Sequence, residues 1–168
     1  MSGVGTGGTI AGVSSYLRER KGGIIIGVAD PHGAAMYSLF SEGQAKASAG
    51  GSVTEGIGLG RVTPIIEDVK AERPYLIPDE EAIPLLFDLL KDEGLCLGGS
   101  SGINVAGAIR LAREMGRGHT IVTILADGGQ RYASRLFNPE FLRSKKLPVP
   151  RWLEGDGGID TPTPLVSG

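Results

Sequence analysis

The sequence has little of three features on which many small proteins depend. Its single cysteine, Cys96, excludes a disulfide within the chain, and the neighbouring Leu95 and Leu97 favour a small core residue over a nucleophile. No apolar run approaches the ~20 residues that span a bilayer and no signal peptide is visible, so we expect a cytoplasmic protein without a membrane partner. A net charge of −2 gives no electrostatic reason to expect a nucleic-acid partner.

Glycine is the residue in excess. The chain has 28 glycines in 168 residues, about twice the usual share of roughly 7%, and they cluster at loop positions without forming a repeat. This distribution favours ligand-binding turns over low complexity. From residue 154 onward little can be buried. We therefore predict one α/β domain over residues 1–153 and a flexible carboxyl-terminal tail over residues 154–168.

The apolar pattern predicts an open, twisted, mostly parallel sheet with helices on both faces. Residues 24–30 and 120–126 are continuous apolar runs, typical of strands buried on both faces. We predict these two strands, a third over residues 95–97, and helices over residues 6–20, 35–40, 80–93, 103–115, 131–137 and 139–146. Most of residues 31–78 is predicted to be loop. Only a stub, Met1 and Ser2, is present of the strand that should precede the first helix.

Three loops join strands to helices, and in an open parallel sheet such loops lie along one edge, where ligands bind. We call residues 3–9 the first loop and residues 98–102 the third loop; the remaining connection begins at residue 127. The first loop offers backbone and hydroxyl donors from five residues: Gly5, Thr6, Gly7, Gly8 and Thr9. These donors are enough for most oxygens of one phosphate, which favours a phosphate monoester.

A dinucleotide is the alternative ligand for the first loop. Gly3, Gly5 and Gly8 fit the dinucleotide-binding spacing, and Asp30 follows at about the distance of a ribose-binding acid. This reading would make the chain a nicotinamide-dinucleotide module. Both ligands remain open at this point.

Two further polar positions are predicted from helix-capping chemistry. Asp79 is expected to be the N-cap of the helix that Gly94 ends. In the third loop, Ser101 is expected to cap a helix beginning at Gly102, which leaves the hydroxyl of Ser100 free to meet a ligand ring.

Four motifs, taken together, resemble a known family. They are Gly5-Thr6-Gly7-Gly8-Thr9, Glu55-Gly56-Ile57-Gly58, Gly98-Gly99-Ser100-Ser101-Gly102 and Arg135-Leu136-Phe137-Asn138-Pro139-Glu140-Phe141-Leu142. In order and spacing they are similar to the cysteine synthase and cystathionine β-synthase family of fold-type II enzymes, which depend on pyridoxal phosphate. The resemblance covers nearly all of residues 3–153 and corresponds to the carboxyl-terminal portion, an incomplete large domain.

The resemblance implies roles for particular residues. The first motif would hold the cofactor phosphate, and Ser100 would face the pyridine nitrogen of pyridoxal phosphate. Gly56 and Gly58, in what we call the second loop (residues 55–60), would lie beside the cofactor and help to close the site. No metal site is expected.

The reaction that the resemblance implies is a β-replacement on a small amino acid. The usual product is cysteine, made with acetate from O-acetylserine and sulfide through aminoacrylate. A neutral serine at the ring nitrogen does not hold the pyridine protonated, which suits such an elimination. Cystathionine formation and serine or threonine dehydration are alternative reactions that use the same phosphate-binding loop.

The Schiff-base lysine of the family and its loop for the substrate carboxylate belong to an amino-terminal half that is absent here. None of the lysines stands in the family's Ser-x-Lys-Asp-Arg context, and Lys46 is the least excluded of them. We therefore predict no catalytic residue in this chain and no activity for the chain alone. It should form a homodimer or associate with the absent half; a non-catalytic assembly partner is the alternative.

Overall fold

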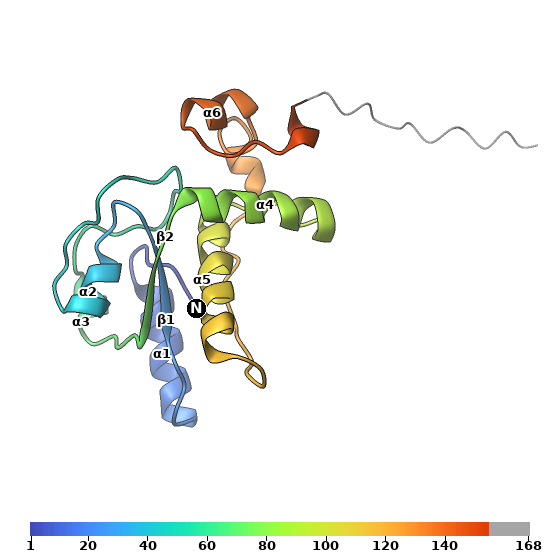
Figure 1. Ribbon diagram of the computed structural model, residues 1–168. Coiled ribbons are helices and arrows are strands. Elements are labelled where there is room, and N and C mark those ends of the chain that lie inside the picture. The colour runs from blue at the N-terminus through green and yellow to red at the C-terminus, as the bar shows by residue number, and fades with distance from the viewer. Residues whose placement is uncertain (155–168) are drawn as a thin grey trace, which may run out of the picture.

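The computed structural model describes residues 1–154, in which helices cover both faces of a small parallel sheet (Figure 1). The strands β1 (Gly27–Pro31) and β2 (Arg73–Ile77) pair in register from Gly27 opposite Arg73 to Pro31 opposite Ile77. The helices are α1 (Gly8–Arg20), α2 (Met36–Glu42), α3 (Pro64–Glu67), α4 (Asp79–Glu93), α5 (Gly99–Met115) and α6 (Pro139–Ser144). Short 3₁₀ helices span Gly129–Tyr132 and Arg151–Leu153.

Alternate residues of β1 contact different helices, which places helices on both faces of the sheet. Val28 packs in a buried cluster with Ile10 of α1 and Met36 of α2. The next residue, Ala29, packs on the opposite side against α5, where a Cβ on Gly107 would lie only 2.7 Å from the Ala29 Cβ. The glycine thus allows α5 to approach the strand closely. This arrangement confirms the predicted α/β class.

The carboxyl-terminal part of the described chain packs on α4. Phe87 of α4 contacts the rings of Phe137 and Trp152 edge-to-face, with centroids 5.7 and 5.8 Å apart.

Helix α4 ends at Gly94 as predicted, and Gly94 has a φ of 70°. Asp79, however, is the first residue of α4 and not its N-cap, which is Pro78. The Asp79 carboxylate instead accepts hydrogen bonds from the 52–53 segment, at 2.6 and 2.7 Å.

Several predicted boundaries are wrong. Residues 31–78 contain α3 and β2, which were predicted as loop; β2 is only half-buried and contains Pro74, so it lacks the alternation that marks a strand. Helix α5 begins at Gly99, four residues earlier than predicted, so most of the third loop forms its first turn. In place of the predicted helix over residues 131–137, the chain forms a 3₁₀ helix and turns. Residues 95–97 form a single antiparallel bridge, Leu97 to Gly128.

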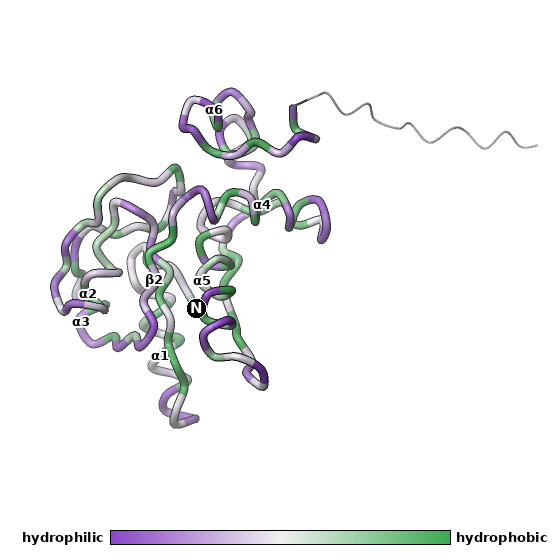
Figure 2. The backbone as a smooth tube through the Cα atoms, in the orientation of Figure 1, coloured by the Kyte–Doolittle hydropathy of each residue, from purple (hydrophilic) through white to green (hydrophobic). Residues whose placement is uncertain are grey.

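The predicted strand over residues 120–126 does not form (Figure 1). Figure 2 shows an apolar stretch that returns beside α5, yet 67% of Val122 and 44% of Leu125 are exposed. The stub lies beside this run: Met1 N donates to Val122 O at 2.8 Å, and Ser2 forms a parallel bridge to Val28 of β1. Helix α5 contacts the run as well, through Thr123 Oγ1, which donates to Asn104 O at 3.3 Å. A strand needs a paired neighbour along its length, and two residues do not supply one.

Two further findings concern residues 1–154 as described. None of their helices combines the length and apolar character needed to cross a membrane. Within the same residues, no group of three or more His, Cys, Asp or Glu side chains is placed to hold a metal ion. The predicted flexible tail falls almost wholly on residues 155–168, which lie outside the described part of the chain.

Candidate functional site

The first loop turns sharply into α1 at Gly7. Gly7 has a φ of 95°, a left-handed conformation that side chains other than glycine rarely adopt. A Cβ at this position would also lie 2.5 Å from Cγ1 of Ile66 in α3. Both observations require glycine, so the tight turn and the packing of α3 against it depend on the same residue.

The amino-terminal end of α1 presents unsatisfied donors to the loop. Ala11 is the first residue whose N–H reaches back along the chain, to Gly7 O at 3.0 Å. The amide N–H groups of the preceding three helical residues, beginning at Gly8, have no carbonyl within the helix to bind. Thr6 and Thr9 are exposed beside them. Together with the positive end of the helix dipole, these groups have the chemistry of an anion-binding cradle, and we call them the cradle.

The second loop lies directly against the first. A Cβ on Gly5 would be 2.5 Å from Gly56 O, so the two backbones meet at a distance that only glycine allows. Gly58 N donates to Val4 O at 3.0 Å, and both Gly56 and Gly58 have positive φ, at 82° and 92°. The structure thus brings together the glycines of two motifs that are 50 residues apart in the sequence.

The fourth motif also reaches the second loop. The Arg135 guanidinium forms an ion pair with the Glu55 carboxylate, and each side chain is nearly half exposed. At that exposure the pair adds little to stability. The ion pair does show that the segment after residue 130 lies beside residues 55–58.

Ser100 lies in the first turn of α5 and is hydrogen-bonded to an aspartate. It is 3% exposed, and its Oγ donates to Asp127 Oδ1 at 3.2 Å. The other carboxylate oxygen of Asp127 accepts from the Tyr132 hydroxyl. This hydrogen bond, with burial as a smaller cause, raises the pKa of Tyr132 above its ordinary value. The backbone of Asp127 is held as well, because its carbonyl accepts from Gly98 N at 2.9 Å.

Ser101 does not cap a helix. The N-cap of α5 is Gly98, which has no capping side chain, and Ser101 lies inside the helix with no exposed surface. Its Oγ has no hydrogen-bond partner among residues 1–154, and neither has Thr54 Oγ1. A Cβ on Gly99 would lie 3.3 Å from Thr54 Cα, so the first turn of α5 packs against the chain that leads into the second loop.

Asn104 connects the third loop to the first. It lies one turn beyond Ser100 on α5 and is 3% exposed. Its Oδ1 accepts from Gly3 N at 2.5 Å, and its Nδ2 donates to Ile124 O at 2.8 Å. Asn104, Asp127 and Tyr132 were not predicted as site residues. The one available signal was spacing, because residue 104 follows residue 100 by one helical turn.

The carboxylate of Asp30 is buried at the start of α2. It is fully buried, and its Oδ2 accepts from Tyr37 N at 2.8 Å, so it satisfies a donor at the start of α2. Burial raises the pKa of its carboxyl to about 6. A side chain with no exposed surface cannot bind a ribose, so the dinucleotide reading loses the acid on which it depended.

The six lysines of the chain are all exposed, namely Lys21, Lys46, Lys70, Lys91, Lys145 and Lys146. Exposure is the ordinary state of a solvated lysine. None lies in the buried, apolar surroundings in which a lysine acts as a nucleophile.

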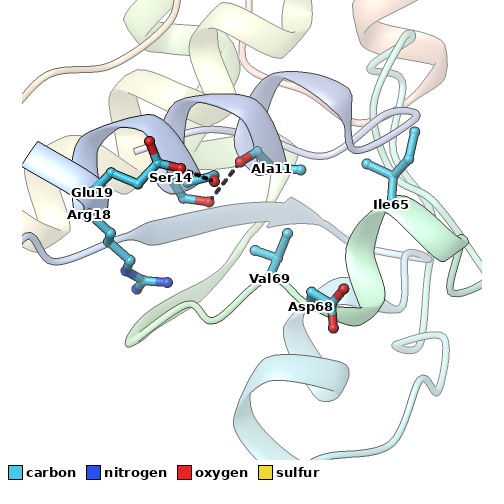
Figure 3. Close-up of a pocket in the computed structure, with 8 residues that line it drawn as sticks. Ala11, Ser14, Arg18, Glu19, Ile65, Asp68 and Val69 are labelled. Atoms are coloured by element: carbon cyan, nitrogen blue, oxygen red, sulfur yellow. Dashed lines mark hydrogen bonds between the residues drawn. The ribbon is translucent and has the colours of Figure 1, made fainter.

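A separate hollow of about 520 Å³ lies between α1 and the end of α3 (Figure 3). Two of its polar side chains have partners: Ser14 Oγ donates to Ala11 O at 3.1 Å, and Arg18 is paired with Glu72. The hollow includes no residue of the first, second or third loop. We attribute it to helix packing.

The structure is an α/β fold in which the first loop meets the second loop at Gly5 and Gly56 and is joined to α5 through Asn104. Comparison with known proteins gives the family. Residues 1–127 match the sequence model of the family described as "Pyridoxal-phosphate dependent enzyme", and the chain belongs to this family. Pyridoxal phosphate, not a dinucleotide, is therefore the cofactor indicated for the chain.

The similar proteins include several cysteine synthases. The chain is 45% identical over 156 residues to Cysteine synthase 1 of Emericella nidulans and 38% identical over 154 residues to Cysteine synthase of Dictyostelium discoideum. These matches cover 89% and 86% of this chain but only 42% and 41% of the relatives. The chain thus spans about two fifths of their length.

A solved structure shows the same fold. The O-acetylserine-dependent cystathionine β-synthase of Helicobacter pylori superimposes with a TM-score of 0.70 at 32% identity. The likeness covers 80% of this chain and 41% of that protein. The sequence comparison and the structural one therefore agree on the resemblance found in the motifs.

Proposed function

We propose that this chain is the carboxyl-terminal part of a pyridoxal-phosphate-dependent cysteine synthase, which makes cysteine and acetate from O-acetylserine and sulfide. The observation that carries the proposal is the contact between the first and second loops, built from Gly5 and Gly56, in a chain 45% identical to a cysteine synthase. The name of the Helicobacter pylori relative supports O-acetylserine as the amino-acid substrate.

The cradle fits the cofactor phosphate. Side chains are excluded where Gly5 and Gly7 line it, and donors are present at Gly8 and at the hydroxyls of Thr6 and Thr9. These residues would hold the phosphate, with Gly56 and Gly58 beside the ring. When bound, pyridoxal phosphate supplies an electron sink that makes the Cα proton of an amino acid acidic.

Asp127 sets the direction of the Ser100 hydroxyl. A carboxylate can only accept, so the Ser100 hydrogen points to Asp127 and the lone pairs of Ser100 remain for a ligand group that donates a hydrogen, which an unprotonated pyridine nitrogen does not. The sequence argument treated Ser100 as an isolated neutral hydroxyl, whereas a carboxylate lies behind it. Asp127 is thus proposed as a positioning residue, which Tyr132 holds from the other side.

The chain alone is proposed to be inactive. Its six lysines are exposed, so no buried amine is present to bind the cofactor covalently or to take the Cα proton. The complete site is then proposed to require residues like those of the amino-terminal half of the relatives, which a second copy of this chain does not supply. Cystathionine formation is the second candidate reaction, favoured by the Helicobacter pylori relative and by a 32% identical cystathionine β-synthase of Dictyostelium discoideum.

The test combines binding with chemical trapping. Pyridoxal phosphate is titrated into the wild-type chain and into the Gly5→Ala and Gly12→Ala variants, and phosphorus NMR measures the bound fraction at each step. We expect saturable binding that Gly5→Ala weakens at least about tenfold and that Gly12→Ala leaves unchanged, because a Cβ at Gly12 meets nothing within 4 Å. Equal affinity in the three proteins would contradict the assigned cradle.

Borohydride reduction of the same samples, followed by peptide mapping, tests the inactivity. We expect scattered, weak labelling of exposed lysines. One specifically labelled lysine, together with turnover of O-acetylserine by the chain alone, would overturn that part of the proposal.

A further inference from the structure

Asp127 lies at the amino-terminal end of α5 and is held there by both its backbone and its side chain. Its carbonyl accepts from Gly98 N at 2.9 Å, and Gly98 is the N-cap of α5. A Cβ on Gly98 would lie only 2.8 Å from Asp127 Cγ, so a larger residue at the N-cap would push the carboxylate away. The carboxylate is therefore fixed beside the first turn of α5, which contains Ser100.

The carboxylate of Asp127 has three partners of suitable polarity. Its Oδ1 accepts from Ser100 Oγ at 3.2 Å, and its Oδ2 accepts from the Tyr132 hydroxyl. The third partner is the positive end of the α5 dipole, because the carboxylate lies against the N-cap of this helix. Each of these partners interacts favourably with a negative charge.

The hydrogen bond between Ser100 and Asp127 fixes what Ser100 can offer a ligand. A hydroxyl has a single hydrogen, and that of Ser100 is directed to Asp127 Oδ1. A ligand atom that approaches Ser100 Oγ therefore meets a lone pair and has to donate a hydrogen. A pyridine nitrogen donates only when it carries a proton.

We propose that Ser100 and Asp127 together form an acceptor for the protonated ring nitrogen of pyridoxal phosphate, with Asp127 supplying the balancing negative charge. The proposed function, on which this inference rests, brings the ring nitrogen to Ser100. The pair replaces the sequence-based expectation of a neutral serine that leaves the pyridine unprotonated. A nearby opposite charge favours the charged form of a titratable group, and a protonated ring is the stronger electron sink.

Other ionisable groups lie near Asp127 and have to be distinguished from it in a test. Tyr132 and Arg131 belong to the 3₁₀ helix, and the Arg131 charge partly offsets the rise in pKa that the Asp127 hydrogen bond and burial cause in Tyr132. Cys96 lies beside the same helix, because a Cβ on Gly129 would be 2.7 Å from its Sγ. The measurement must therefore report on the ring nitrogen itself.

The experiment uses pyridoxal phosphate that carries an isotope label at the ring nitrogen. It is added to the wild-type chain until phosphorus NMR shows saturation, and nitrogen NMR then follows the ring nitrogen over a series of pH values. We expect the nitrogen of the bound cofactor to keep its proton to a higher pH than that of free pyridoxal phosphate, with its pKa raised by at least about 1 unit.

Asp127→Asn removes the charge but keeps the shape of the side chain, so the proton affinity of the bound ring nitrogen should fall at least about tenfold. Tyr132→Phe is the matched control, because it removes a donor from the same carboxylate and leaves the charge in place. The ring nitrogen should then stay protonated as in the wild type. A purely structural role of Asp127 predicts instead that the two variants behave alike.

Two further variants complete the series. Ser100→Ala removes the acceptor atom and keeps the carboxylate, so it should also lower the pKa of the ring nitrogen, and it serves as the test if Asp127→Asn does not fold. Asp88→Asn removes an exposed carboxylate of α4 and should leave the nitrogen and phosphorus signals unchanged.

Three results would overturn the inference. A bound ring nitrogen that loses its proton at a lower pH than the free cofactor shows that Ser100 donates to it. An equal nitrogen pKa in the wild type and in Asp127→Asn shows that the carboxylate does not act on the ring. In both cases, binding that Gly5→Ala weakens leaves the proposed function standing. The absence of saturable binding to the wild-type chain refutes the inference together with the assigned cradle.

Discussion

Residues 24–30 and residues 120–126 are two apolar runs of equal length, but only the first contributes to a strand of the structure. The first supplies β1, where Val28 and Ala29 have no exposed surface. The second forms no strand and leaves Val122 67% exposed. Both runs adjoin the stub, the first through Ser2 and the second through Met1. The difference is that β1 has β2 on its other edge along five residues.

An apolar run can form a buried strand, but the run by itself does not ensure that the strand forms. Backbone pairing and helices on both faces convert that capacity into structure. Run 24–30 has α1 and α2 on one side and α5 on the other, whereas run 120–126 is joined to α5 and leaves Val122 and Leu125 exposed.

The largest expected effect comes from placing the same charge in each run. Val28→Asp buries a carboxylate at a position with no exposed surface and should cost more than about 4 kcal/mol, abolishing cooperative unfolding. Val122→Asp should change the free energy of unfolding by less than about 0.5 kcal/mol. Chemical denaturation measures both.

Val28→Ala keeps this comparison measurable if Val28→Asp does not fold. It should cost about 2 kcal/mol through lost burial and the cavity that remains. A loss at Val122 as large as that at Val28 would show that run 120–126 is packed after all.

The next effect is a pH dependence at the end of the first run. The folded-state pKa of Asp30 is raised from 3.8 to about 6, so the native state binds this proton more tightly than the unfolded state. The contribution to stability is present below pH 4 and is lost as the pH rises through 6. The stability of wild type relative to Asp30→Asn should therefore fall by up to about 3 kcal/mol between pH 4 and pH 7. Parallel stability curves for the two proteins would contradict the burial of this carboxyl.

A third prediction concerns the loop that follows the stub. Gly7→Ala forces a left-handed residue against Ile66 and should cost about 1–3 kcal/mol. Gly12→Ala, five residues later in α1, meets no atom within 4 Å and should stabilise by up to about 1 kcal/mol. Thermal unfolding of the two variants gives the sign directly. A stabilised Gly7→Ala would mean that the turn does not require glycine.

The smallest effect lies just beyond the second run, at Asp127. Asp127→Asn removes the carboxylate that accepts from the Tyr132 hydroxyl, so the pKa of Tyr132 should move down toward its ordinary value. Phenolate absorbance follows the titration, and Tyr132→Phe identifies the component that moves. If that component has the same pKa in Asp127→Asn as in the wild type, Asp127 does not hold this network together.

The sequence predicted best what depends on local chemistry. The helices that became α1 and α4, the end of α4 at Gly94 and the parallel strand at residues 27–31 follow from periodicity and glycine stops. The α/β class and the family follow from the loops. These features need only the residues that compose them.

The parts that were wrong depend on distant residues. β2 forms because it pairs with β1, although Arg73 and Pro74 are residues that do not indicate a buried strand in the sequence. Ser101 is enclosed inside α5 because that helix begins at Gly99, and so it caps nothing. Asn104 is hydrogen-bonded to Gly3, which is 101 residues away in the sequence, and no local sequence pattern predicts such a contact.

The central proposal is that this chain supplies the phosphate cradle of a cysteine synthase but does not complete the reaction alone. The direct test is cysteine formation from O-acetylserine and sulfide with pyridoxal phosphate present, measured for the chain by itself and after addition of the amino-terminal part of the Emericella nidulans relative. The account predicts no turnover above the no-protein blank for the chain alone, and turnover for the mixture that Gly5→Ala abolishes. Turnover by the chain alone, or none in a mixture that forms a complex, would contradict it.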